Sequence, residues 1–161
     1  MTIQQGLQKA GALITSAAAA ELKEQGHFLT GSLERSIKAA TTKINGGWQL
    51  QVTSSDYQKY LHWGVMPEKA SMRQYPFVVD YFKKRGLEEK DAKRAAAATI
   101  KTWIKEGMPT KNSFTFAANG KRLKFLDDTD QASWKAVDAA VQKGLDDEIN
   151  TTFHKTKSET I

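Results

Sequence analysis

Apolar positions at a spacing of three and four residues mark the start of the chain. Residues 2–25 place Ile3, Leu7, Ala10 and Ile14 on one side of a helix and polar residues on the other. An alanine run near the end of this segment favours helix and keeps the helix thin. The pattern predicts an amphipathic helix that covers a core.

The pattern changes to strict alternation after Gly47, and residues 37–44 before the turn are mixed but tolerate a strand. Trp48, Leu50 and Val52 alternate with polar residues, which is the period of a strand with one face in a core. Asn45-Gly46-Gly47 precedes this run and supplies residues that tolerate the positive φ of a primed turn. We predict a β-hairpin over about 35–54.

A dense aromatic segment follows the hairpin. Tyr57, Tyr60, Leu61 and Trp63 share a face if a short helix begins near residue 56 and stops at Gly64. The segment 64–76 contains proline and reads as a loop. We expect this loop to serve as a docking arm, because long loops often become ordered on partner binding.

Three more helices are predicted from their caps and apolar faces. Pro76 suits the first turn of a helix over about 76–85, and glycine follows the basic end of that helix. A second helix over about 88–106 ends before Gly107 and Pro109. The last helix runs from about Asp130 to Phe153, and 154–161 is expected to be a flexible tail. Its apolar stripe consists of Trp134, Val137, Val141, Leu145 and Ile149.

A second hairpin is predicted over about 113–126. Asn119-Gly120 lies between the apolar pairs Phe114/Phe116 and Leu123/Phe125, and Asn-Gly between alternating apolar residues is a strong hairpin signal. Together these elements define an α+β class: a small antiparallel sheet packed by long N-terminal and C-terminal helices.

Length and composition set the remaining bounds. The 161 residues suit one domain, 1–161. Cysteine is absent, which excludes disulfides, thiol nucleophiles and cysteine metal sites and suits folding in a reducing cytoplasm. The N-terminus lacks the pattern of a signal peptide, and no apolar run approaches the roughly 20 residues that span a bilayer. The net charge of +6 permits contact with nucleic acid without requiring it.

No catalytic or metal-binding arrangement stands out. His27, His62 and His154 are too isolated to form a helical zinc pair. The acidic run 127–130 lacks the glycine and the later glutamate of a calcium loop and suffices as a helix start. We therefore expect a protein that is not an enzyme and that needs no cofactor and no metal.

Aromatic and basic residues give the candidate contact surfaces, and two interpretations remain open. The aromatic residues could be core or subunit contacts, or they could stack on bases while the cations meet phosphates. The aromatic candidates are Trp48, Tyr57, Tyr60, Trp63 and Phe114, and the candidates for DNA contact are Lys121, Arg122 and Lys124.

Two short motifs in this order resemble a known family. Thr-Gly-Ser-Leu-Glu-Arg-Ser-Ile at 30–37 and Tyr-Gln-Lys-Tyr-Leu-His-Trp-Gly at 57–64 are similar to signatures of the tail-component and tail-completion family of long-tailed double-stranded-DNA bacteriophages. The resemblance covers about 30–115. Trp63 stands where family members usually have an acidic residue, and the hairpin at 113–126 reads as an addition.

The resemblance implies an α+β structural protein of the virion neck or tail. It implies that copies form a ring at the head–tail junction, assembled in the host cytoplasm, between the capsid connector or adaptor and the tail-tube proteins. Cations facing the lumen of such a ring would touch passing DNA without reading its sequence. The alternatives are a small basic DNA-binding module and, less favoured, a hydrolase or nuclease with an unrecognised site.

Overall fold

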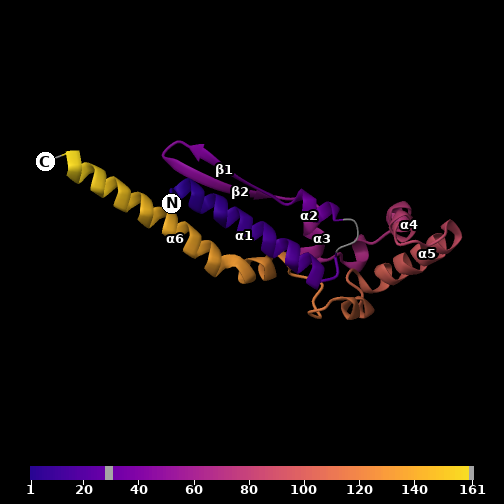
Figure 1. The fold of residues 1–161 in the computed structure, drawn as a ribbon. Coiled ribbons are helices and arrows are strands. Elements are labelled where there is room, and N and C mark those ends of the chain that lie inside the picture. The colour runs from indigo at the N-terminus through magenta and orange to yellow at the C-terminus, as the bar shows by residue number, and fades with distance from the viewer. Residues whose placement is uncertain (28–30, 160–161) are drawn as a thin grey trace. The chain divides into compact units, whose positions relative to one another are not determined.

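The structure is a computed structural model that describes residues 1–27 and 31–159, and the chain divides into two compact units. Unit 1 comprises Met1–Lys23, Gly31–Ser55 and Phe125–Ile161, and unit 2 comprises Glu24–Thr30 and Asp56–Lys124. The prediction of a single domain stays a prediction. In chain order the elements are α1 (Ile3–Glu24), α2 (Ser32–Ser36), β1 (Lys38–Ile44), β2 (Gly47–Thr53), α3 (Gln58–Trp63), the 3₁₀ helices η1 (Pro67–Lys69) and η2 (Met72–Gln74), α4 (Tyr75–Lys84), α5 (Glu89–Glu106), the 3₁₀ helix η3 (Lys111–Phe116) and α6 (Phe125–Glu159) (Figure 1).

The predicted α+β class is confirmed. The sheet is a two-stranded antiparallel hairpin, and long helices occupy both ends of the chain. No third strand pairs with the hairpin within residues 1–27 and 31–159, so β1 and β2 each keep one edge without a neighbouring strand.

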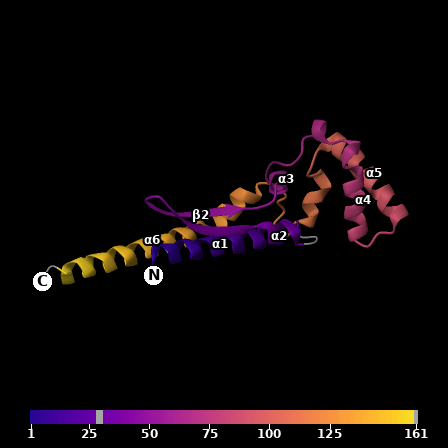
Figure 2. The ribbon, with the colours of Figure 1, turned by 90° about the horizontal axis from the view of Figure 1, so that it is seen from above.

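In unit 1 the hairpin lies along α1 (Figures 1 and 2). A Cβ atom built on Gly11 of α1 would lie 2.7 Å from Ala39 Cβ and 3.0 Å from Leu50 Cδ1, so only glycine allows this approach. Leu50 and Trp48 are half-buried on that side, as the alternation predicts, whereas Val52 remains 40% exposed. One helix is therefore too narrow to cover the whole face of the hairpin.

The first hairpin has the predicted position but a different turn. Ile44 pairs with Gly47 across Asn45 and Gly46. Gly46 has a φ of 85°, but Asn45 is not in the positive-φ region. Both primed turn types require a positive φ at the first central residue, which is Asn45, so the turn is not primed.

The C-terminal helix is longer than predicted and buries a different face. α6 begins at Phe125. Of the expected flexible tail 154–161, residues 154–159 continue as helix and residues 160–161 lie outside the described residues. Its buried face consists of Phe125, Thr129, Ser133, Ala140 and Gly144.

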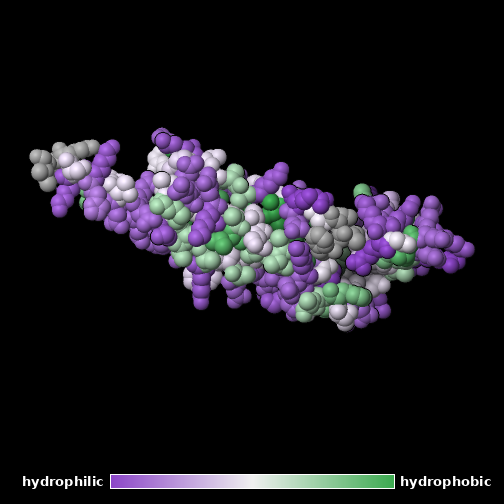
Figure 3. Space-filling view, viewed as in Figure 1, coloured by the Kyte–Doolittle hydropathy of each residue, from purple (hydrophilic) through white to green (hydrophobic). Residues whose placement is uncertain are grey.

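Close contact with α1 explains this choice of face. A Cβ on Gly6 would lie 2.8 Å from the Ala140 carbonyl oxygen, and one on Gly144 would lie 3.2 Å from Gly6 Cα. Two helices whose backbones approach this closely must meet through their smallest residues. The larger apolar residues then remain at the margin, and apolar surface is visible over α1 and α6 in Figure 3.

The core of unit 2 lies between α4 and α5. Val78, Ala96 and Ile100 form its centre, and Ala92 is also fully buried. The apolar periods of both helices are thus confirmed in their central residues. Partly buried neighbours complete the cluster: Tyr75, Val79, Phe82 and Trp103.

The predicted second hairpin over 113–126 is wrong. Residues Lys111–Phe116 form η3, and Phe125 already belongs to α6. The backbone donors of the intervening segment bond elsewhere: Ala118 N–H donates to the Glu24 carbonyl at 2.7 Å, and Lys124 N–H donates to the His62 carbonyl at 3.1 Å. Because these distant carbonyl groups accept the hydrogen bonds of Ala118 and Lys124, those two N–H groups do not need partners on an opposite strand.

The loop expected over 64–76 contains short ordered turns. It holds η1 and η2, and Val65 exchanges two backbone hydrogen bonds with Met108 at 2.8 and 2.7 Å. A role as a docking arm stays a prediction.

Candidate interaction surface

Helix α3 carries the most exposed of the predicted aromatic residues. Tyr57, just before the helix, is 52% exposed, Tyr60 is 53% exposed and Trp63 is 69% exposed. The helix is anchored by Leu61, which is buried. The Tyr57 and Tyr60 rings lie 6.1 Å apart, so they form one continuous aromatic surface. We call Tyr57, Tyr60 and Trp63 the α3 aromatic surface.

Two arginines of unit 2 lie near tyrosine rings, and one of them, Arg122, lies near Tyr57 of this surface. The Arg85 guanidinium lies 5.2 Å from the centre of the Tyr81 ring, within cation–π range. Arg122 is half-buried; burial lowers its pKa, nearby Tyr81 and Tyr57 raise it, and the charge of Arg85 lowers it further. Neither arginine forms an ion pair within the described part of the chain. Tyr57, Tyr81, Arg85 and Arg122 therefore form an arginine–tyrosine cluster with uncompensated positive charge.

The cations predicted at 121–124 divide between two environments. Arg122 belongs to the cluster, and its Nε is buried without a hydrogen-bond partner among the described residues. Lys121 and Lys124 are exposed. Lys124 has a φ of 61° at the start of α6, where its backbone redirects the chain into the helix.

The other two predicted aromatic residues lie apart from α3. Phe114 is half-buried in η3 of unit 2. Trp48 is half-buried in β2 of unit 1, opposite Lys43 in the hairpin register. The structure therefore groups three of the five predicted aromatic residues on α3 and gives Phe114 and Trp48 separate positions.

His27 is a partly buried histidine whose pKa is lowered by its surroundings. Burial, followed by the charge of Arg122, lowers its pKa from 6.5 to about 4, and a hydrogen bond with the Arg122 backbone offsets this in part. Its Nε2 is buried without a partner among the described residues. The imidazole is therefore neutral at pH 7 and acts as a packed side chain beneath the cluster.

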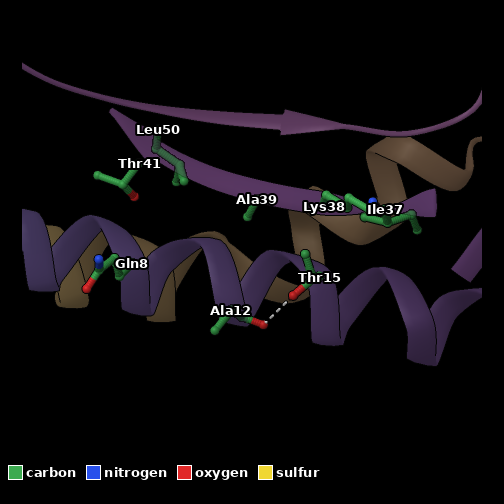
Figure 4. Close-up of a pocket in the computed structure, with 8 residues that line it drawn as sticks. All are labelled: Gln8, Ala12, Thr15, Ile37, Lys38, Ala39, Thr41 and Leu50. Carbon is green, nitrogen blue, oxygen red and sulfur yellow. Dashed lines mark hydrogen bonds between the residues drawn. The ribbon is translucent and has the colours of Figure 1, made fainter. Parts of the chain in front are cut away.

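Two open depressions accompany these surfaces. A groove of about 570 Å³ runs between α1 and the hairpin, lined by residues that include Gln8, Lys38 and Leu50 (Figure 4). A depression of about 400 Å³ in unit 2 lies beside Tyr60 and Trp63, with Lys59 and Lys69 at its edges. Both are open and of mixed polarity, which suits contact with a macromolecule better than enclosure of a small ligand.

In residues 1–27 and 31–159, no three side chains of His, Asp or Glu gather in a way that could hold a metal ion. None of the helices described is both long and apolar enough to cross a membrane.

Sequence reasoning missed Tyr81, Arg85 and His27 as neighbours of the candidate residues. In the sequence, Arg85 belongs to the basic end of its helix and Tyr81 to the apolar face of the same helix. Neither residue carries a local signal that links it to Tyr57 or to Arg122, because the link exists only through the packing of unit 2.

Comparison of the chain with protein-family models, with curated proteins and with solved structures found no match. The structure by itself assigns the chain to the α+β class. Its exposed aromatic and basic side chains are candidates for contact with a macromolecule.

Proposed function

We propose that this protein is a structural subunit of the neck or tail of a long-tailed double-stranded-DNA bacteriophage, and that copies of it form a ring at the head–tail junction. The observation that carries the proposal is the α3 aromatic surface, because it falls within the second motif of the resemblance and is 52–69% exposed. Exposed contiguous aromatic residues are typical of protein interfaces.

A ring requires two different surfaces on each subunit, one for each neighbour. The α3 aromatic surface of unit 2 supplies one candidate. The free edges of β1 and β2 supply another, because unpaired strand edges accept a strand from a neighbouring molecule. The fold class expected from the resemblance also agrees with the structure.

Size-exclusion chromatography with light scattering and negative-stain imaging test this proposal. We expect ring-shaped oligomers for the natural chain and weakened rings for Trp63→Ala. Phe77→Ala is the matched control, because Phe77 is an exposed aromatic residue of unit 2 outside α3 (77% exposed) and its loss leaves the rings intact. A protein that remains monomeric and is absent from purified phage particles would contradict the proposal.

A second candidate function is non-specific DNA binding, favoured by the arginine–tyrosine cluster. Arg85 and Arg122 lack acidic partners in the described chain and lie beside aromatic rings, a combination that binds phosphates and stacks on bases. If an isolated monomer binds DNA this way, Arg85→Gln should reduce the slope of log affinity against log salt by about 1. Arg94→Gln on exposed α5 is the control and should leave the slope unchanged.

A further inference from the structure

Helix α6 has an apolar stripe that is only partly covered within unit 1. Each of Trp134, Val141 and Leu145 follows a residue of the buried face by one position, which is about 100° around a helix. Trp134 and Ile149 are each 50% exposed, whereas the three stripe residues between them are half-buried. The stripe consists of Trp134, Val137, Val141, Leu145 and Ile149.

The position of α1 explains why this stripe is only partly buried within the described part of unit 1. Gly6 and Gly144 hold α1 against the small-residue face of α6. Turning α6 to bury the stripe would place bulky side chains where the backbones now meet. The packing therefore leaves the stripe half-covered at its centre and exposed at Trp134 and Ile149, where a partner could bury it.

The C-terminal end of α6 extends beyond α1. The Met1 ammonium forms an ion pair with Asp147 at 2.9 Å, and Ile3 N–H donates to Glu148 at 2.7 Å. Past this point the helix continues to Glu159, as Figures 1 and 2 show, and residues 148–158 are all exposed. Phe153 is 72% exposed on this end. An isolated helical segment of this length is marginal in water, so a partner would stabilise it.

We propose that α6 pairs antiparallel with α6 of a second copy of this chain through the stripe. Charge near the helix ends favours the antiparallel direction. The first turns carry Asp127, Asp128 and Asp130, whereas the last turns carry Lys155 and Lys157 together with Glu159. An antiparallel pair places the acidic end of each copy beside the basic end of the other, whereas a parallel pair would place like charges together. The helix dipoles also oppose each other in the antiparallel pair.

The stripe sets the register. Its midpoint, between Trp134 and Ile149, lies beside Val141, and pairing about this point places Trp134 opposite Ile149 of the second copy. Asp130 then comes within one helical turn of Lys155, on the same side of the stripe. The uncovered end, 148–159, lies opposite 124–135 of the second copy. This single register therefore covers both the stripe and the exposed end of α6.

This contact goes beyond the proposed function and does not depend on it. It relates two copies by a two-fold axis and joins them as a pair, whereas a ring uses other surfaces. A ring whose α6 helices remain unpaired would refute this inference alone, and α6 pairing without rings would refute the proposed function alone.

Disulfide mapping tests the pairing, because the natural chain has no cysteine. In the full chain, Val141→Cys should cross-link two copies under mild oxidation. Trp134→Cys and Ile149→Cys should cross-link when mixed and only weakly when each is alone. Asn150→Cys is the control, because Asn150 is exposed on the far side of α6 and should not cross-link. Equal cross-linking of Val141→Cys and Asn150→Cys, or efficient self-cross-linking of Trp134→Cys, would overturn the proposal.

Charge exchange gives a second test with exposed residues that leave the core intact. Lys155→Glu should raise the dissociation constant of the pair about tenfold, measured by analytical ultracentrifugation, because it places acid beside Asp130. Adding Asp130→Lys should restore the affinity. Lys157→Glu makes the same charge change on the opposite side of the helix and should have little effect. Equal effects of Lys155→Glu and Lys157→Glu, or no restoration, would contradict the register.

Discussion

At the scale of single residues, glycine decides how closely the helices of unit 1 pack. A Cβ atom at Gly6 would lie 2.8 Å from a backbone oxygen of α6, which cannot rotate away as a side chain could. Gly47, in contrast, has open space around it and no positive φ. These two glycines allow the same substitution to be compared with and without a steric conflict.

We expect Gly6→Ala to lower the free energy of unfolding by about 1–2 kcal/mol. Overpacking of a tight contact costs about 1–3 kcal/mol, and the better helix propensity of alanine returns up to about 1 kcal/mol. Gly47→Ala should change stability by less than about 0.5 kcal/mol. Urea denaturation measures both, and equal effects would contradict the close contact of α1 and α6.

Also at this scale, burial of His27 makes stability depend on pH. Its pKa in the folded state is about 4, below the ordinary 6.5, so the unfolded chain binds the proton more readily. The contribution of the neutral imidazole is fully present above pH 6.5 and is lost as the pH falls toward 4. The shift from 6.5 to about 4 corresponds to about 3–4 kcal/mol at about 1.4 kcal/mol per pKa unit, and partial exposure of the imidazole to solvent keeps the contribution below that full amount.

Thermal unfolding between pH 6.5 and 4.5 tests this prediction. His27→Gln should remove a large part of the loss of stability in this range, because glutamine does not titrate. His154→Gln, at an exposed position of α6, should keep the natural pH dependence. If the two variants behave alike, His27 does not control the transition.

At the scale of elements, the pair α4–α5 depends on a few large side chains. Ile100 is fully buried, whereas Ile104, one turn later on the same helix, is 46% exposed. We expect Ile100→Ala to cost about 2–5 kcal/mol of unfolding free energy and Ile104→Ala about 1 kcal/mol or less. Guanidinium denaturation compares the two, and similar costs would mean that the core of unit 2 lies elsewhere.

The helices and the hairpins also show why some local sequence patterns predict structure better than others. Long apolar periods identified α1, α4, α5 and α6, because each helix satisfies its own backbone and needs only one covered side. A hairpin depends on a partner strand, so its signal is weaker. The Asn119-Gly120 turn had a good local signal, yet its neighbours bonded to Glu24 and His62 instead.

At the scale of the whole molecule, the two compact units suggest two units of unfolding. Each unit is built from segments that are distant in the sequence, and the segments of one unit contact one another. Such units often open with different free energies. Ile100→Ala should therefore weaken unit 2 more than unit 1.

Hydrogen–deuterium exchange with mass spectrometry can locate this effect. In Ile100→Ala we expect faster exchange in Tyr75–Glu106 and little change in α1 and in residues 125–147 of α6. Gly6→Ala should give the reverse pattern. A uniform acceleration across both units in either variant would instead support the single cooperative domain that the chain length predicts.

The sequence by itself determined the class of the fold, the first hairpin and the approximate bounds of the helices. These follow from patterns within about 20 residues, because periodicity, caps and turn residues act locally. It also identified the aromatic residues of α3, although their exposure could not be read from spacing.

Only the tertiary structure decided which face of each element is buried. The apolar stripe of α6 was the natural choice for a core, but the contact of Gly6 with Gly144 turned the small-residue face inward. The grouping of Tyr57 with Arg85 and Arg122 likewise depends on contacts between distant segments. Close packing is a property of pairs of surfaces, and for that reason a single stretch of sequence cannot specify it.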